Sequence, residues 1–264
     1  MSVVGKVESL WRYPVKSMRG QELESAFAGF TGIYGDRIYA FLDTAARAHF
    51  PYLTAREKEQ MLLYRPSFRD AERASKPDHQ HHGDALAPGL TPLNAPSSEL
   101  MVDVQTPEGG SFAIDDPELT QLLCEGLHER HHLRLMRSQR ALTDCHPISL
   151  FSTQTAQQIG TDIGVTLDKR RFRANIYLDL NSRQGFGEDQ LVGRSVRIGA
   201  KAVLAVLDRD TRCKIIITLD PDTAEPNPEV MKRVARSYGG QAGVYAAVMV
   251  EGTVCAGDEV CLLD

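Results

Sequence analysis

The chain has 264 residues, of which 42% are hydrophobic and 25% are charged, as in an ordinary soluble globular protein. This length is enough for one large domain, or for two closely packed domains, with a real hydrophobic core. The formal net charge of −5 argues against a nucleic-acid binder that works through bulk positive charge, although it allows a local basic pocket.

The sequence predicts a protein of a reducing compartment that is not inserted in a membrane. No apolar run is long enough to span a bilayer, and the N-terminal segment lacks the uninterrupted apolar core of a signal peptide. The five cysteines are scattered without a C-x-x-C pair, which is typical of reduced thiols rather than a disulfide framework. We therefore expect a cytoplasmic protein with neither a membrane partner nor a nucleic-acid partner.

The first half of the sequence is predicted to be rich in short strands. An alternating pattern predicts a strand over residues 3–13, which Pro14 ends. Further apolar runs of strand length cover residues 37–43 and 59–68. Two more runs flank the turn residues 106–110 and predict a hairpin.

A long surface loop and a mixture of helices and strands are predicted for the remainder. Residues 70–98 are rich in Pro, Gly, Ser and Asp and have no period, so we expect a loop there. Capping residues and apolar stripes predict helices over residues 115–130, 152–164 and 227–240. Strands are predicted over residues 175–180, over 195–209 (two strands joined at 199–200) and over 243–264 (two or three strands).

These elements predict a mostly β protein of the α+β class. There is no regular alternation of strands and helices, which excludes a doubly wound parallel sheet as the favoured architecture. A β-barrel or a twisted mixed sheet with short peripheral helices fits the pattern better.

Cys213 is the strongest single candidate for chemistry. It stands between charged residues and the apolar run 215–217, which we interpret as the start of a buried strand. The nearby cations Arg209, Arg212 and Lys214 would stabilise a thiolate, which is both a nucleophile and a soft metal ligand. The alternative is an inert, buried cysteine at the start of that strand.

Cations and polar residues near strand ends are candidates for binding an anion. Lys16 and Ser17 follow the first strand and offer an ammonium and a hydroxyl at a loop, where phosphate could bind. Asn175 is a polar residue where the strand pattern favours an apolar one. Four arginines at strand edges could bind phosphate or a heterocycle, with surface ion pairs as the alternative; they are Arg37, Arg170, Arg171 and Arg173.

Asp144, Cys145 and His146 occur in a row, which suggests a thiol–imidazole pair or a metal site. Adjacent residues rarely point the same way, so we interpret Asp144 and His146 as walls of a pocket instead. Six of the eight histidines lie in two clusters, at 79–82 and 128–132. The second cluster has helical spacing, but no acidic or thiol partner stands at a fixed spacing, so we favour structural or solvent-exposed roles for both.

Six motifs, taken together and in this order, resemble the MOSC proteins, named after the C-terminal domain of molybdenum cofactor sulfurase. The resemblance is to the longer form, in which an N-terminal β-barrel domain precedes the MOSC domain, as in the mitochondrial amidoxime reducing component and its bacterial relatives. The motifs are LWRYPVKS (10–17), GDRIYAFLD (35–43), LTAR (53–56), FRANIYLD (172–179), FGEDQLVG (186–193) and DRDTRCKIIITLDPDT (208–223).

The resemblance implies two β-rich units, which we expect at residues 1–115 and 116–264, with a molybdenum cofactor (molybdopterin) held between them. It implies that Cys213 binds the molybdenum and that Asp144 is an acidic residue near the pocket. The residues DCH at 144–146 depart from the small residues expected after the aspartate, which leaves the substrate class open. The positions that match cofactor-binding residues are Lys16, Ser17, Arg37, Arg173, Asn175 and Thr211.

Two functions follow from the resemblance. The first is a molybdenum oxidoreductase, with Cys213 and Asp144 as its catalytic residues, that reduces small N-oxygenated compounds such as amidoximes or hydroxylamines. The sequence holds no electron-transfer domain, so such an enzyme would need electrons from a separate protein or reductase. The alternative is a non-catalytic carrier of the molybdenum cofactor, or of sulfur held on Cys213. A scaffold with an empty pocket would leave the grouping of these residues unexplained.

Overall fold

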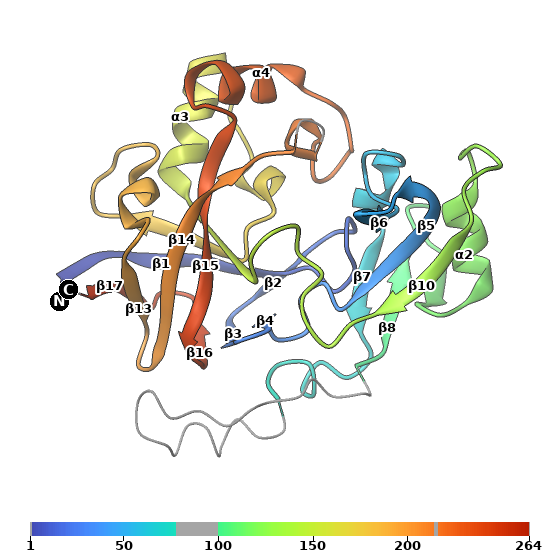
Figure 1. Ribbon diagram of the computed structural model, residues 1–264, viewed down its shortest axis with the longest axis horizontal. Helices are drawn as coiled ribbons and strands as arrows, with labels where there is room; N and C mark the ends of the chain where they lie inside the picture. Colours follow the sequence, from blue (N-terminus) through green and yellow to red (C-terminus); the bar gives the residue numbers. More distant parts are fainter. Residues whose placement is uncertain (1, 78–99, 214–215, 264) are drawn as a thin grey trace.

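The structure, a computed structural model, describes residues 2–77, 100–213 and 216–263 (Figure 1). The histidine cluster at 79–82, most of the loop expected at 70–98, and Lys214 lie outside the described residues. The described part is mostly β, with three α-helices and four short 3-10 helices. The predicted fold class, a mostly β protein with peripheral helices, is therefore confirmed.

Seven strands form a closed barrel at one end of the molecule (Figure 1). Neighbouring strands follow the order β12, β11, β15, β14, β13, β17 and β1; pairing of β1 with β12 closes the ring, and β2 pairs with β1 outside it. The bounds are β1 Ser2–Arg12, β2 Gln21–Leu23, β11 Ile148–Ser152, β12 Ile176–Leu180, β13 Ser195–Ile198, β14 Ala202–Thr211, β15 Gln241–Val250 and β17 Glu259–Leu263.

The barrel closes because its strands alternate apolar and polar side chains. In β13, Val196 and Ile198 are buried, whereas Ser195 and Arg197, which alternate with them, are half-buried. This period of two directs one face of each strand inward, where it packs into a single core with residues such as Leu10. Burying one such side chain contributes about 1.5–3 kcal/mol, so the barrel is a rigid support for the loops at its rim.

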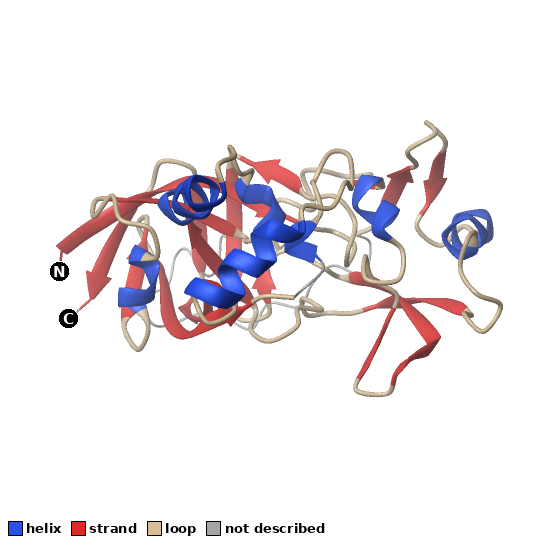
Figure 2. Cartoon of the chain, turned by 90° about the horizontal axis from the view of Figure 1, so that it is seen from above, coloured by secondary structure: helices blue, strands red, loops and turns tan. Residues whose placement is uncertain are grey.

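The remaining strands form three small sheets, and most of them lie at the other end of the long axis (Figures 1 and 2). A second core, which includes Phe41, Met61 and Leu119, packs among them. The sheets are β10-β5-β6 (Leu133–Arg137, Tyr39–Arg47, Phe50–Tyr52), β7-β8-β9 (Arg65–Phe68, Val102–Gln105, Ser111–Ala113) and β16-β3-β4 (Gly252–Cys255, Ser25–Gly29, Gly32–Ile33).

The predicted helix starts are confirmed by their caps. The side chains of Asp116, Ser152 and Asn227 accept hydrogen bonds from backbone N–H groups in the first turns of helices α2 (Pro117–Cys124), α3 (Thr153–Ile163) and α4 (Pro228–Ser237). Helices α3 and α4 lie side by side against one end of the barrel (Figure 1). The four 3-10 helices are η1 (Glu59–Leu63), η2 (Lys169–Phe172), η3 (Gly187–Leu191) and η4 (Ile216–Thr218).

Strand pairing crosses the boundary expected between residues 115 and 116 in both directions. Strand β1 lies in the barrel beside β12 and β17, whereas β10 pairs with β5. Strand β16 likewise pairs with β3. The two units therefore exchange strands in space, and the boundary along the sequence stays a prediction.

One predicted strand is only partly a strand, and a second is not a strand in its described part. The run 59–68 begins with the 3-10 helix η1, and only Arg65–Phe68 is a strand. The run after Cys213 is not a strand: its described part belongs to the 3-10 helix η4. Both errors have one cause, because periodicity cannot separate a short apolar strand from a short buried helical turn.

The helix predicted over residues 115–130 is also shorter than expected. It ends at Cys124, and Gly126 takes a left-handed backbone conformation with φ 76° that favours glycine. His131 lies beyond this end, and its Nδ1 atom is 2.7 Å from Oδ2 of Asp43. Within the described residues, no helix is long and apolar enough to cross a membrane.

Candidate functional site

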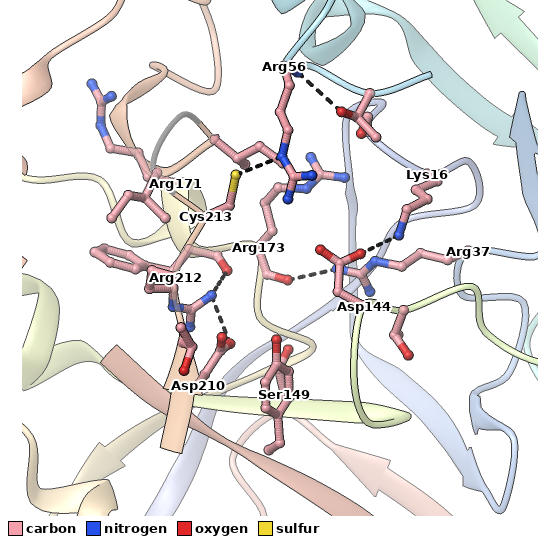
Figure 3. A pocket seen from close by; sticks show the side chains of 18 of the residues that line it. Lys16, Arg37, Arg56, Asp144, Ser149, Arg171, Arg173, Asp210, Arg212 and Cys213 are labelled. Atoms are coloured by element: carbon pink, nitrogen blue, oxygen red, sulfur yellow. Dashed lines mark hydrogen bonds and ion pairs between the residues drawn. The ribbon is translucent and has the colours of Figure 1, made fainter. Parts of the chain in front are cut away.

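A cavity of about 760 Å³, including the space at its mouth, lies between the barrel and the smaller sheets (Figure 3). Of the eight site residues predicted from the sequence, seven line it, namely Lys16, Ser17, Arg37, Asp144, Arg173, Thr211 and Cys213. Their individual roles stay predictions, because proximity alone does not show binding.

Cys213 follows the end of strand β14 and faces the cavity, where a guanidinium contacts it. Nε of Arg56 donates a hydrogen bond to the Cys213 sulfur at 3.1 Å (Figure 3). The sequence neighbours point elsewhere, since Arg209 pairs with Asp189 at 2.9 Å and Arg212 pairs with Asp210 at 2.9 Å. Among the described residues, the cation at the thiol therefore comes from the LTAR segment rather than from Arg209 or Arg212.

Lys16 and Asp144 form an ion pair on the opposite wall. The ammonium lies 2.5 Å from Oδ1 of Asp144 and also donates to the carbonyl of Leu142 at 2.7 Å. Burial lowers the pKa of Lys16, and the Asp144 carboxylate offsets only part of that effect. Burial by itself would raise the pKa of Asp144, but Lys16, Arg37 and Arg56 outweigh burial, and the pKa is lowered. Asp144 is thus held as a carboxylate.

The lowered pKa of Asp144 predicts a pH-dependent contribution to stability. A carboxylate with a lowered pKa stabilises the folded state fully above about pH 4, its ordinary value, and loses that contribution as the pH falls through the folded value. The difference in free energy of unfolding between the wild type and Asp144→Asn should therefore shrink below about pH 4. Urea unfolding between pH 3 and 7 measures it, with the exposed Asp115→Asn as control. A constant difference across this range would contradict the assignment.

Arg37 and Arg173 are held next to each other by Tyr13. Their guanidiniums stack on its ring at 4.5 and 4.3 Å, and Arg37 donates to the carbonyl of Arg173 at 2.9 Å. Ser17, Arg37 and Arg173 have φ values of 65°, 47° and 51°, which non-glycine residues seldom adopt. Such strain gathers at functional sites, where surrounding contacts hold it. Burial lowers the pKa of Arg173 to about 10, so it stays charged at neutral pH.

Asn175 lies behind the wall of the cavity instead of in its lining. Its side chain is buried, with Oδ1 accepting from the backbone N–H of Ser149 at 3.2 Å and Nδ2 donating to the carbonyl of Trp11 at 3.3 Å. Ser149 does line the cavity. The polar residue in an apolar pattern therefore joins β11 to β1, and direct contact of Asn175 with a cofactor stays a prediction.

Sequence reasoning missed several lining residues. Arg56 is the last residue of the LTAR motif. This motif supports the family resemblance, but it does not indicate that the Arg56 side chain lines the cavity. Asp210, only three positions before Cys213, lines the same wall. Phe50 and Tyr245 carried no signal in the sequence, because each is an ordinary residue of a strand that only the fold brings to this cavity.

The charge of the lining fits an anionic ligand. Six cations, Lys16, Arg37, Arg56, Arg171, Arg173 and Arg212, face two carboxylates, Asp144 and Asp210. Two of their side-chain nitrogens, Nε of Arg171 and Nη2 of Arg212, are buried without a hydrogen-bond partner in the part of the chain that the structure describes. A buried donor left unpaired costs about 1–3 kcal/mol, so these groups suit a ligand with acceptor oxygens.

The donor set fits a metal that takes a single protein ligand. The described residues contain no group of three or more His, Cys, Asp or Glu side chains that could hold a metal ion. A cofactor that brings its own metal ligands needs only one soft donor from the protein, and the Cys213 thiol beside Arg56 supplies one. The cations and the thiol together therefore fit a molybdenum cofactor.

The fold and the site define a closed β-barrel protein with a thiol and a cluster of cations in one cavity. Two family matches agree with this class: the MOSC N-terminal beta barrel domain matches residues 4–105, and the MOSC domain matches residues 137–261. The chain is therefore a MOSC domain protein that carries both domains, as its motifs indicated.

The individual relatives are distant. The chain is 25% identical to mitochondrial amidoxime-reducing component 1 of Mus musculus, over 98% of this chain and 83% of that protein. The YUAD protein from Bacillus subtilis aligns with 97% of this chain and 94% of its own, at a TM-score of 0.47 and 14% identity. YiiM from Geobacillus stearothermophilus aligns with 45% of this chain and 55% of its own, at a TM-score of 0.35 and 19% identity.

Proposed function

We propose that this protein binds the molybdenum cofactor in the cavity and reduces small N-oxygenated compounds with electrons from a separate electron-transfer protein or reductase. The observation that carries the proposal is the Cys213 thiol, held at 3.1 Å from Arg56 in a cavity lined mainly by cations. The name of the mouse relative supports the substrate class, because that protein is called amidoxime-reducing.

The chain's own residues divide into two groups in this proposal. Cys213 is the ligand to molybdenum, and Arg56 donates a hydrogen bond to its sulfur. Phosphate and pterin oxygens would accept hydrogen bonds from the opposite wall, where guanidinium forks and hydroxyls suit them. These residues are Lys16, Ser17, Arg37 and Arg173, and Thr211 at the end of β14 offers a further hydroxyl from the Cys213 side.

The bound cofactor would supply a metal centre that accepts an oxygen atom and passes two electrons. Asp144, kept ionised by Lys16, can accept a hydrogen bond from the amino group of an amidoxime and so orient it. Phe172 and Ile217 give the lining apolar surface, against which an aromatic or aliphatic substituent can pack and exclude water.

The test begins with protein from a host that makes the molybdenum cofactor. Molybdenum is measured by elemental analysis and pterin by fluorescence, and benzamidoxime is then supplied with reduced methyl viologen as electron source. Near-stoichiometric metal and pterin, with formation of benzamidine, would support the proposal. Absence of both metal and pterin would overturn it. Metal and pterin without reduction of any N-hydroxylated compound would instead favour the carrier function.

A further inference from the structure

The proposed reduction needs a proton source inside the cavity. For a hydroxylamine the balance is R–NH–OH + 2e⁻ + 2H⁺ → R–NH₂ + H₂O, so the N–O bond breaks, the departing hydroxyl gains one proton and the nitrogen gains the other. The separate electron-transfer protein supplies the two electrons. A titratable side chain that lines the cavity can deliver a proton to the departing group from a fixed position, which bulk water cannot. The inference below rests on the proposed function.

Most titratable groups that line the cavity within the described residues are poor candidates for this proton donor. Asp144 is held as a carboxylate by Lys16 at 2.5 Å, and Cys213 is the proposed metal ligand. Burial raises the pKa of Asp210, but this carboxylate is paired with Arg212 at 2.9 Å. The Asp210 side chain is only 3% exposed, so Asp210 cannot readily regain a proton from solvent. Burial likewise raises the pKa of Tyr245, which makes its phenol a poor acid.

His146 differs from these groups because it reaches both the cavity and solvent. It lines the cavity, and its side chain is 33% exposed. Its Nε2 atom is 3.4 Å from Oδ2 of Asp208, whose side chain is 71% exposed. Its ring packs edge-on against Tyr245 at 5.6 Å. The contact through Nε2 leaves Nδ1 as the ring nitrogen that can face a ligand.

Charged and polar groups from three segments surround this ring. Asp208 on β14 is the carboxylate at the ring, and Tyr245 on β15 covers one side. Asp144 and Cys145 precede His146 on its own loop, and Asp210 lies further inward on β14. A pair at 3.4 Å between exposed groups is weak. Imidazole is also the side chain whose ordinary titration range spans neutral pH, so it can both give and regain a proton.

We propose that His146 is the proton donor of the reaction, with its Nδ1–H directed to the departing oxygen of the substrate. Asp208 and Tyr245 act as positioning residues that hold the ring between solvent and the cavity. The imidazolium gives its Nδ1 proton to the departing hydroxyl as the N–O bond breaks. The nitrogen takes the second proton from solvent at the mouth of the cavity, and Nδ1 is reprotonated from the same solvent before the next turnover. This role would also explain why a histidine occupies a place where the family resemblance favours a small residue.

The first experiment compares the pH profile of benzamidoxime reduction in the wild type, His146→Gln and the control His132→Gln, with molybdenum and pterin measured in each. His132 is exposed and outside the cavity lining. The wild-type kcat should fall as the pH rises and the imidazolium loses its proton. His146→Gln should keep the cofactor, lose kcat by about 10²–10⁴-fold and lose this pH dependence, with partial rescue by added imidazole. A variant with the wild-type kcat and pH profile would overturn the proposal.

A second measurement separates this proposal from the proposed function. Benzamide carries a carbonyl oxygen where benzamidoxime carries its oxime nitrogen, one bond from the position of the departing oxygen, and it has no N–O bond to reduce. Its binding, followed by calorimetry, should tighten as the pH falls in the wild type and weaken about tenfold or more in His146→Gln at low pH, since a hydrogen bond from a charged donor is lost. Binding that neither the pH nor the variant alters would overturn the role of His146, whether or not the wild type reduces benzamidoxime. A wild type that does not reduce benzamidoxime would contradict the proposed function, but by itself it would not contradict the role of His146.

Discussion

Replacement of Cys213 by serine is expected to remove molybdenum from the protein. Thiolate is a soft ligand that suits the metal, whereas a serine hydroxyl stays protonated at neutral pH and is a poor donor to it. Loss of a group that merely supports a metal ligand costs about 10–100-fold in affinity, so loss of the ligand itself should cost at least as much. Elemental analysis of the variant and the wild type, prepared together from a host with an intact cofactor pathway, measures the change.

Cys145→Ser is the matched control for this substitution. Cys145 is exposed and is not among the residues that line the cavity. It should retain the molybdenum content of the wild type. Equal molybdenum in Cys213→Ser and the wild type would contradict the assignment of Cys213 as the metal ligand. Loss of metal with retained pterin would locate the defect at the metal, because the cations on the opposite wall remain in place.

Replacement of Phe172 by alanine is expected to lower the free energy of unfolding by about 3–5 kcal/mol, as for other fully buried aromatic residues. Phe172 is 2% exposed, and its ring stacks on Phe151 with centroids 4.2 Å apart. The substitution would leave a cavity beside a barrel strand and would remove an aromatic contact of the Arg212 guanidinium, which lies 5.3 Å from the Phe172 ring. Urea unfolding of cofactor-free protein measures the loss.

Phe30→Ala provides the comparison for Phe172→Ala. Phe30 is 43% exposed, so the same truncation there should change the free energy of unfolding by only about 0.5 kcal/mol or less. Similar unfolding midpoints for the two variants would mean that the wall of the cavity can collapse around the missing ring. A large difference would show that the buried cluster around Phe172 and Phe151 forms a rigid wall of the cavity, which a preorganised site requires.

The cavity lies where two separately packed cores meet. Cys213 and Arg212 extend from the barrel strand β14, whereas Arg56 follows β6 of the smaller sheets. Ligand sites often form at such junctions, because neither unit has to bury polar groups in its own core. A ligand held here would contact both units, so its binding should also stabilise their packing against each other.

The sequence by itself determined the local structure and the composition of the site. Alternation of side chains predicted most strands, and the cap residues Asp116, Ser152 and Asn227 marked the helix starts, because these signals act within a few residues. The six motifs led to the MOSC family and contain six of the seven predicted residues that line the cavity; the seventh is Asp144. Short apolar runs were the exception, since at 59–63 and 216–218 a turn of 3-10 helix buries the same side chains as a strand.

Only the tertiary structure decided which of these residues meet. Arg56 contacts Cys213 across 157 positions, and Lys16 pairs with Asp144 across 128, whereas Arg209, four positions from Cys213, turns to Asp189. Successive side chains on a strand point to opposite faces, so nearness along the chain does not place two groups together. Asn175 illustrates the same limit, because its burial behind Ser149 depends on how three strands pack. Long-range packing of the two cores sets these contacts, and a single sequence does not encode it in any local pattern.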